Sequence, residues 1–341
     1  MCVAGSAIHS NSKGAIMRIS TSLQALAGAA AIAMLAGCSG GGSYAIAPIP
    51  ATQSSGHQLV RRYACPATGS LKYVSDGFYN VVNVYTGIFA GQAPCGQIVS
   101  TSLMFPTALY VQPTTHDLYV ANQRGRNVLV FHRGQADPYN TYTDPSGQVP
   151  NDIAVAGDGT VLVINYTNIS QTEKGSISTW IGGPNGGTFV GNFPEMHSYQ
   201  GAHIAINKNG KIYYDDVDRH ILQGFVWSLS CPAGACGAQH RVLGLILKFP
   251  GGMAFDNTGD LLIVDSMRPS LDTFELPNPT PSTLPIAGFP DSMAMSSQDH
   301  HLFIINAYHH NAEEYSYPDG ALIGSVNGQQ NSILAGIAVD P

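Results

Sequence analysis

Charged residues are scarce in this sequence. Lysine, arginine, aspartate and glutamate make up 11 % of its 341 residues, far below the quarter that is typical of soluble domains. Its 15 basic residues are outnumbered by 22 acidic ones, giving a formal net charge of −7. A surface of this sign repels phosphate backbones, so the composition argues against nucleic acid as a partner. The 38 glycines and 21 prolines indicate many tight turns and favour a β fold over a helical one.

Several well-known catalytic motifs are also missing. The chain contains no Walker-type glycine-rich loop, no Gly-x-Ser-x-Gly turn, no His-Glu-x-x-His segment and no Cys-x-x-Cys pair. Nucleotide chemistry, serine hydrolysis and zinc proteolysis are therefore disfavoured.

One apolar run near the start indicates export. The 14 residues Leu23–Ala36 follow the basic residues Lys13 and Arg18, which is the length and flank pattern of a signal-peptide core rather than of a membrane span. The run ends in Leu35-Ala36-Gly37-Cys38, and Ser-Gly-Gly-Gly-Ser follows. These residues resemble a bacterial lipobox with a flexible tether behind it.

The lipobox resemblance implies that Cys38 is acylated and becomes the mature N-terminus, with sorting to the outer membrane of the cell envelope. We therefore expect a signal peptide over residues 1–37, with Met17 as an alternative start, a lipidated tether over 38–57 and a folded domain over 58–341. The mature chain would carry a net charge of −9 because Lys13 and Arg18 are removed. The alternative is an ordinary cleaved signal in which the cysteine occurs by chance.

Internal repetition sets the expected fold. Short segments that end at Leu109, Ile153, Ile204, Met253, Met293 and Ile337 recur at intervals of 40 to 51 residues. After each of the first five, a second apolar segment ends in Asp or Asn 12 or 13 residues later. Turn residues such as Gly157-Asp158-Gly159 lie between the two segments, so each repeat begins with a β-hairpin.

The repeat resembles the NHL family, in which a Gly-Ile-Ala-Val-Asp-like strand leads to a Leu-Tyr-Val-Ala-Asp-like strand. Gly336-Ile337-Ala338-Val339-Asp340 and Leu118-Tyr119-Val120-Ala121-Asn122 carry this resemblance. Lys72-Tyr73-Val74-Ser75-Asp76 is a second strand without a first, and the C-terminal segment is a first strand without a second. Together they would complete one split blade, so we predict an all-β, six-bladed β-propeller whose first blade is closed by the C-terminal strand.

This topology sorts the loops onto two faces. Loops that lead into an inner strand or follow a second strand share one face, here the top face, and the other loops share the bottom face. Cys65, Cys95, Cys231 and Cys236 allow three disulfide connectivities. Because Cys65 and Cys95 both fall on the bottom face of the split blade, and because Cys231 and Cys236 share one bottom loop, we expect the bonds Cys65–Cys95 and Cys231–Cys236.

Polar residues near the start of the inner strands form the candidate site, because they would line the top mouth of the central channel. As ligand-binding candidates we take Thr107, Asn151, Asp152, His203, Asp291 and Ser292. Asn151, Asp152 and Asp291 could supply oxygen ligands to Ca²⁺ or another divalent metal, and His203 and Asp152 are the candidate catalytic residues. The alternative is a water-filled channel whose polar groups cap strand ends.

Two enzyme families give a further comparison. The regucalcin and gluconolactonase-like propellers hold a metal with Glu, Asn, Asn and Asp, of which Asn151 and Asp291 would match two, but Ala335 and Gly336 stand where the Glu should be. Streptogramin-lyase-like propellers use a channel histidine, a role that His203 could take.

Other polar residues are given structural roles. The pairs His300-His301 and His309-His310 flank a second strand and should therefore lie on opposite faces, too far apart to share a metal. The Asp or Asn that ends the second strand recurs in all six repeats and should cap a turn.

The varied top-face loops carry Phe78, Tyr79, Arg124, Arg126, Tyr166, Arg219, His220, Arg268, Tyr308 and His309.

The sequence thus favours a membrane-tethered binding or scaffold module, with no cofactor, that contacts a protein, peptide or envelope glycan through its top face. Contact with the membrane would be through the lipid anchor only. The alternative is a metal-dependent lactonase or lyase with its site at the channel mouth.

Overall fold

The computed structural model describes residues 65–166, 175–182, 187–194, 201–218, 223–278, 280–298 and 300–341. Contacts divide the chain into two units, Met1–Pro48 and Ile49–Pro341, and all the described residues belong to the second. The expected signal peptide, Cys38 and the tether lie outside these residues, as do Arg219 and His220. Among the described residues there is no helix with the length and apolar character needed to span a membrane.

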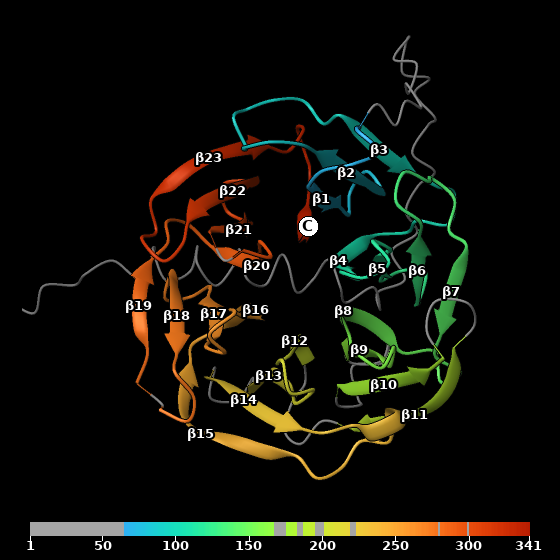
Figure 1. The fold of residues 1–341 in the computed structure, drawn as a ribbon, viewed down its shortest axis with the longest axis vertical. Coiled ribbons are helices and arrows are strands. Elements are labelled where there is room, and N and C mark those ends of the chain that lie inside the picture. The colour runs from blue at the N-terminus through green and yellow to red at the C-terminus, as the bar shows by residue number, and fades with distance from the viewer. Residues whose placement is uncertain are drawn as a thin grey trace, which may run out of the picture. The chain divides into compact units, whose positions relative to one another are not determined.

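Six four-stranded antiparallel sheets are arranged in a ring about a central axis (Figure 1), as the repeat predicted. From the channel outward, blade 1 consists of β24 (Leu334–Asp340), β1 (Leu71–Asp76), β2 (Val81–Tyr85) and β3 (Gly96–Val99). Blade 2 consists of β4 (Pro106–Val111), β5 (Leu118–Asn122), β6 (Asn127–Phe131) and β7 (Asn140–Thr143). Blade 3 consists of β8 (Val149–Val155), β9 (Val161–Tyr166), β10 (Ser176–Ile181) and β11 (Thr188–Pro194).

The other three blades follow the same order. Blade 4 consists of β12 (Gly201–Ile206), β13 (Ile212–Asp218), β14 (Gln223–Leu229) and β15 (His240–Leu247). Blade 5 consists of β16 (Pro250–Phe255), β17 (Leu261–Asp265), β18 (Ser270–Phe274) and β19 (Ser282–Pro285). Blade 6 consists of β20 (Pro290–Met295), β21 (His301–Asn306), β22 (Asn311–Ser316) and β23 (Leu322–Asn327). One 3₁₀ turn, Pro232–Gly234, lies between β14 and β15.

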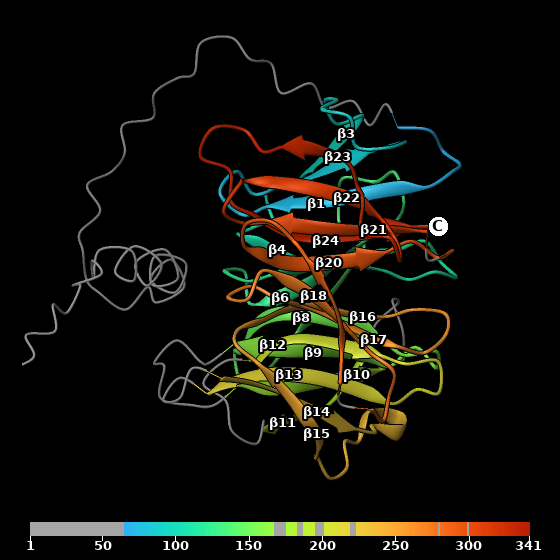
Figure 2. The same cartoon turned by 90° about the vertical axis from the view of Figure 1, so that its left-hand side faces the viewer.

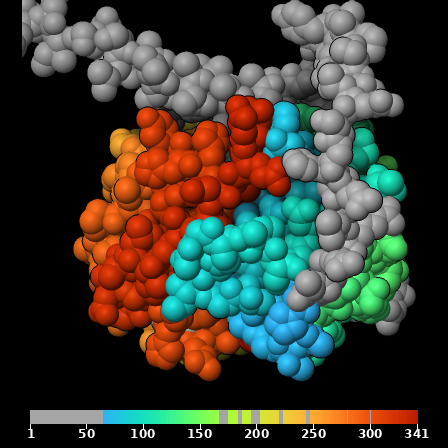
Figure 3. All heavy atoms as spheres, turned by 90° about the horizontal axis from the view of Figure 1, so that it is seen from above, coloured from blue at the N-terminus to red at the C-terminus, as the bar shows by residue number. Residues whose placement is uncertain are grey.

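The C-terminal strand closes the ring. β24 pairs antiparallel with β1, with Tyr73 opposite Ala338 and Val74 opposite Ile337, and Figure 2 shows red β24 below blue β1. β24 also contacts the inner strands β4 and β20 of the two adjacent blades. Blade 1 and blade 6 consequently abut on the rim (Figure 3), although they come from opposite ends of the folded domain. The predicted split blade is confirmed.

Burial explains why the second strands are apolar on both faces. Every residue of β1, β5, β17 and β21 except His301 is buried, because each sheet packs both faces against neighbouring blades. The inner strands pack most closely. A Cβ atom on Gly336 would lie 2.1 Å from the carbonyl oxygen of Thr107, and one on Gly252 would lie 2.3 Å from the backbone nitrogen of Met293. Glycine at these positions therefore lets adjacent inner strands approach each other.

Both predicted disulfides are present on the bottom face. Cys65 is bonded to Cys95, with Cα atoms 5.0 Å apart, and Cys231 is bonded to Cys236. The first bond closes a loop of sequence separation 30 and the second one of only 5. The bond that closes the longer loop contributes more to stability, about 3 kcal/mol in total in the chain-entropy description.

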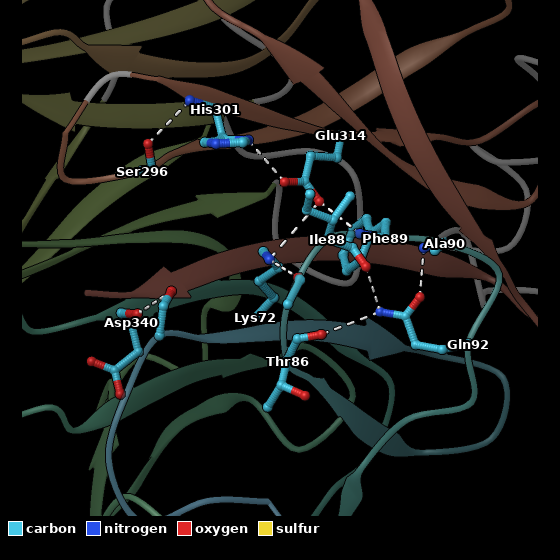
Figure 4. A network of polar contacts seen from close by, with 12 residues as sticks. Lys72, Thr86, Ile88, Phe89, Ala90, Gln92, Ser296, His301, Glu314 and Asp340 are labelled. Carbon is cyan, nitrogen blue, oxygen red and sulfur yellow. Dashed lines mark hydrogen bonds and ion pairs between the residues drawn. The ribbon is translucent and has the colours of Figure 1, made fainter.

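A buried polar network joins blades 1 and 6 on the bottom side (Figure 4). The carboxylate of Glu314 accepts a hydrogen bond of 2.8 Å from the backbone of Phe89, and lies 3.8 Å from Lys72 Nζ and 2.9 Å from His301 Nδ1. Lys72 also donates to the carbonyl of Gly87 and lies over the Phe303 ring. Burial lowers the pKa of Lys72, against the attraction of Glu314.

The two histidine pairs are separated as predicted. His301 begins β21 and belongs to the bottom network, whereas His309 follows the other end of β21 and contacts Asn306 and Glu313 on the top side. In the part of the chain that the structure describes, no group of three or more His, Cys, Asp or Glu side chains is placed to hold a metal ion.

Candidate functional site at the channel mouth and top face

The Asp or Asn that ends the second strand caps backbone groups in four blades, as predicted. Its side-chain oxygen accepts a hydrogen bond from the loop that leads into the inner strand, which joins Asp76 to Ile333, Asn122 to Met104, Asp265 to Phe249 and Asn306 to Phe289. These bonds fix the backbone of the top-face loops against the sheet beneath them.

Blades 3 and 4 use the same position differently. Asn165 donates to the hydroxyl groups of Ser176 and Ser178, and Asp216 accepts a 2.9 Å hydrogen bond from the Trp227 indole. Burial, followed by the nearby charge of Asp215, raises the pKa of Asp216 to about 7. Among the described residues, the hydrogen-bond partners of this position in blades 3 and 4 are therefore side chains of the same blade.

The structure distributes the predicted channel residues between two roles. Thr107 is buried, and its hydroxyl lies 3.2 Å from the carbonyl oxygen of Ala121 and 3.3 Å from that of Asn151, so it bonds blade 2 to blade 3. Ser292 is buried beside Asp291 on β20. By contrast, the charges of Asp152 and Asp291 act on His203, although the three residues lie on three different inner strands.

His203 forms an ion pair with a carboxylate from its own blade. Its Nδ1 lies 3.4 Å from Asp215 Oδ2; the histidine side chain is 14 % exposed and the aspartate is fully buried. Neither atom has a partner with hydrogen-bond geometry among the described residues. Asp215 Oδ1 instead accepts the backbone N–H of His203 at 3.1 Å.

The charges of this cluster are strongly coupled. Burial alone would lower the pKa of His203, but the attractions of Asp215, Asp152 and Asp291 together outweigh that effect, and the pKa rises to about 9. Burial raises the pKa of Asp152 to about 6, opposed by the charge of His203. Burial also raises the pKa of Asp215 and of Asp291. At neutral pH His203 is therefore an imidazolium, which is not the form that a general base requires.

This coupling predicts a pH dependence of stability. Because the folded-state pKa of His203, about 9, exceeds its ordinary value of 6.5, its protonation stabilises the fold fully below pH 6.5 and this contribution disappears as the pH rises through 9. The loss corresponds to about 3 kcal/mol. Urea denaturation across this window should show a steeper decline for the wild-type protein than for His203→Gln. The exposed His300→Gln variant is the control and should keep the wild-type slope; an equal slope in His203→Gln would contradict the assignment.

The cluster fits a calcium ion poorly. Asp152 Oδ1 accepts the N–H of Ile153 at 2.8 Å and its Oδ2 accepts that of Ile204 at 3.0 Å, so both oxygens already bridge blades 3 and 4. Asp215 is engaged with His203. Asp291 is the one carboxylate of the three with no hydrogen bond among the described residues, whereas Ca²⁺ takes six to eight oxygen ligands.

Two parts of the site were missed from the sequence. The first is Asp215, which directly precedes the recurring Asp216. The residues at the same position in the other blades are mostly apolar: Ser75, Ala121, Ile164, Val264 and Ile305. A charged side chain at this position was therefore the signal in the sequence. The second omission is a recurring Phe-Pro at the start of an inner strand: Phe105-Pro106, Phe249-Pro250 and Phe289-Pro290. All three phenylalanines are half-buried at the top face, and the rings of Phe249 and Phe289 lie 6.3 Å apart.

The top face exposes an arc of large apolar side chains on four consecutive blades. Six residues form this top-face arc: Met267 of blade 5, Tyr308 of blade 6, Phe78, Tyr79 and Ile333 of blade 1, and Met104 of blade 2. Their exposed fractions run from 40 % for Tyr79 to 70 % for Tyr308. Exposed apolar groups gathered on one face of a soluble domain are a mark of an interaction surface.

The top-face arc is held by contacts between adjacent blades. The Tyr79 hydroxyl donates to the carbonyl of Gln330 at 2.5 Å, and Gly77 donates to the carbonyl of Ile333 at 2.9 Å. Asn80 Oδ1 accepts the N–H of Phe105 at 2.6 Å, which connects blade 1 to blade 2. The arc is therefore a fixed surface, as expected of a preorganised binding site.

Comparison with known proteins establishes the fold and no more. No family model matches the sequence, and no curated protein matches it. Among solved structures, a chain of a nidogen/laminin complex superposes with a TM-score of 0.65 at 11 % identity, over 80 % of this chain and 99 % of that one. A functionally unknown protein from Desulfotomaculum acetoxidans and one from Bacteroides caccae each superpose with a TM-score of 0.56 over the same shares, at 13 % and 14 % identity. The chain is a six-bladed β-propeller, the fold that the NHL resemblance implied.

Proposed function

We propose that this propeller is a binding module that recognises a segment of another protein on the top face. The observation that carries the proposal is the top-face arc, whose six exposed apolar residues continue across blades 5, 6, 1 and 2. Methionine and isoleucine occur in it beside aromatic residues, and this mixture suits a protein surface better than a sugar ring, which needs aromatic faces.

The proposal includes the lipid anchor predicted at Cys38. The first described residue, Cys65, is bonded to Cys95 on the bottom face, which is the face opposite the arc. A tether from an outer-membrane anchor would leave the top face free to meet a partner in the envelope. Mass spectrometry of the mature N-terminus tests this part: diacylglycerol on Cys38 supports it, and an unmodified terminus removes it.

The binding proposal is tested with peptides selected from a random display library on the purified exported chain. Because a few central anchors supply most of the affinity of an interface, we expect Phe78→Ala and Tyr308→Ala each to weaken a selected peptide by about 2 kcal/mol, roughly thirtyfold. Isothermal titration calorimetry measures the change.

Matched controls lie away from the top face. Ile88, in a bottom loop, and Leu322, at the bottom end of outermost strand β23, are 54 % and 57 % exposed, so Ile88→Ala and Leu322→Ala remove similar apolar area and should leave affinity unchanged. Equal losses in all four variants, or selection of peptides insensitive to all of them, would contradict recognition by the arc.

A further inference from the structure

The channel mouth beside the top-face arc gathers three carboxyl groups around one histidine. Asp215 pairs with His203, and the charges of Asp152 and Asp291 also act on this histidine. Asp215 is fully buried and its Oδ2 lacks a hydrogen bond. Buried carboxylates without full compensation are costly unless a positive charge approaches them.

Carboxylates dominate the surroundings of this cluster as well. Asp76, Asp144 and Asp265 lie at the top-face ends of their sheets, and Asp272 and Glu313 lie within the third strands β18 and β22; all five are buried. The lysines and arginines described on the same face are Arg124, Arg126, Lys248 and Arg268, and Arg268 is already paired with Asp265 and Asp272. The described carboxyl groups therefore outnumber the lysines and arginines on this face, an imbalance that attracts a cationic ligand.

Two aromatic residues lie close in sequence to the carboxyl group of Asp291. Phe249 and Phe289 immediately precede the inner strands β16 and β20, and Asp291 is the second residue of β20. A half-buried pair of rings near a carboxylate favours an ammonium or guanidinium group, because the ring faces and the carboxylate attract the same charge. Asp291 is the carboxylate whose oxygens are not committed to the fold.

Resting on the proposed function, we propose that the recognised segment carries a lysine or arginine side chain, which enters the channel mouth toward Asp291 and the Phe249–Phe289 pair while neighbouring apolar residues cover the top-face arc. The partner is thus a protein segment with a basic residue flanked by apolar ones. One long cation needs a single free carboxylate and a negative field, whereas a calcium ion needs an oxygen shell that these residues do not provide.

The test repeats the peptide selection in parallel on the wild-type full chain, on Asp291→Asn and on Asp319→Asn. Asp319 is an exposed carboxylate in a bottom turn, so its variant carries the same change of net charge. We expect wild-type and Asp319→Asn selections to return peptides with a fixed lysine or arginine, and Asp291→Asn to lose that preference. Replacing the basic residue of the best peptide by norleucine should weaken wild-type binding more than tenfold and Asp291→Asn binding much less.

Different failures have different meanings. Peptides that bind through the top-face arc but show no basic residue, or a norleucine peptide bound equally well, would overturn the cation proposal and leave the binding module intact. Peptides insensitive to Tyr308→Ala would overturn both. Calorimetric titration with CaCl₂ alone forms the last arm: stoichiometric binding that Asp291→Asn abolishes would assign the mouth to a metal and overturn the proposal.

Discussion

Deleting Leu334–Pro341 should abolish the cooperative unfolding transition of the propeller. The deletion removes β24, including the buried side chains of Leu334, Ile337 and Ala338, and exposes the edge of β1. Burial of each large apolar side chain contributes about 1.5–3 kcal/mol, and the unpaired strand edges add to the loss. A whole domain is stable by about 5–15 kcal/mol, so the open ring should not remain folded.

Asp340 adds a second connection between the last strand and the ring. Its fully buried carboxylate lies 2.6 Å from His116 Nδ1 and pairs with the Arg133 guanidinium, both from blade 2. Deletion of the exposed Pro341 alone is the matched control and should leave thermal unfolding unchanged. Circular dichroism on heating separates the outcomes: a truncated chain that melts cooperatively within a few degrees of the intact protein would contradict closure by β24.

Glu314→Ala should be the most damaging single substitution in the network of Figure 4. It removes the acceptor of the Phe89 N–H and the counter-charge of Lys72, leaving a buried ammonium without a carboxylate. Breaking a buried pair in this way costs about 3–5 kcal/mol. Urea denaturation of the exposed-site variant Glu275→Ala provides the comparison, with an expected change within about 0.5 kcal/mol.

A double variant distinguishes the buried charge from a simple packing defect. Adding Lys72→Met to Glu314→Ala removes the unpaired ammonium and should recover part of the lost stability. If the double variant is as unstable as the sum of the two single ones, the charge pair is not what joins blade 1 to blade 6.

The fold was readable from the sequence because its repeat unit is local. The distance from Ile153 to Asn165 reports a hairpin regardless of what surrounds it, and the unmatched strands at Tyr73 and Ile337 reveal the closure once the repeat is recognised. The disulfides followed in the same way, since the face of each cysteine depends only on strand order.

The candidate site was only partly readable, because it depends on contacts between strands far apart in sequence. Asp152, His203 and Asp291 could be placed at the channel mouth from their position in the repeat, but nothing local distinguishes Asp291, which is free of hydrogen bonds, from Thr107, whose hydroxyl bonds neighbouring blades. Asp215 was not predicted because the recurring residue of the repeat is the neighbouring Asp216. The exposure of Met104 and Met267 likewise depends on how the loops pack on each other.

The most direct test of top-face recognition is hydrogen–deuterium exchange of the full chain with and without a selected peptide. Recognition by the arc predicts slower exchange in residues 77–80, 104–105, 266–268 and 307–309 when the peptide is bound, with no change in the bottom loops 86–95 and 317–322. Protection confined to those bottom loops, or spread evenly around the ring, would contradict the account.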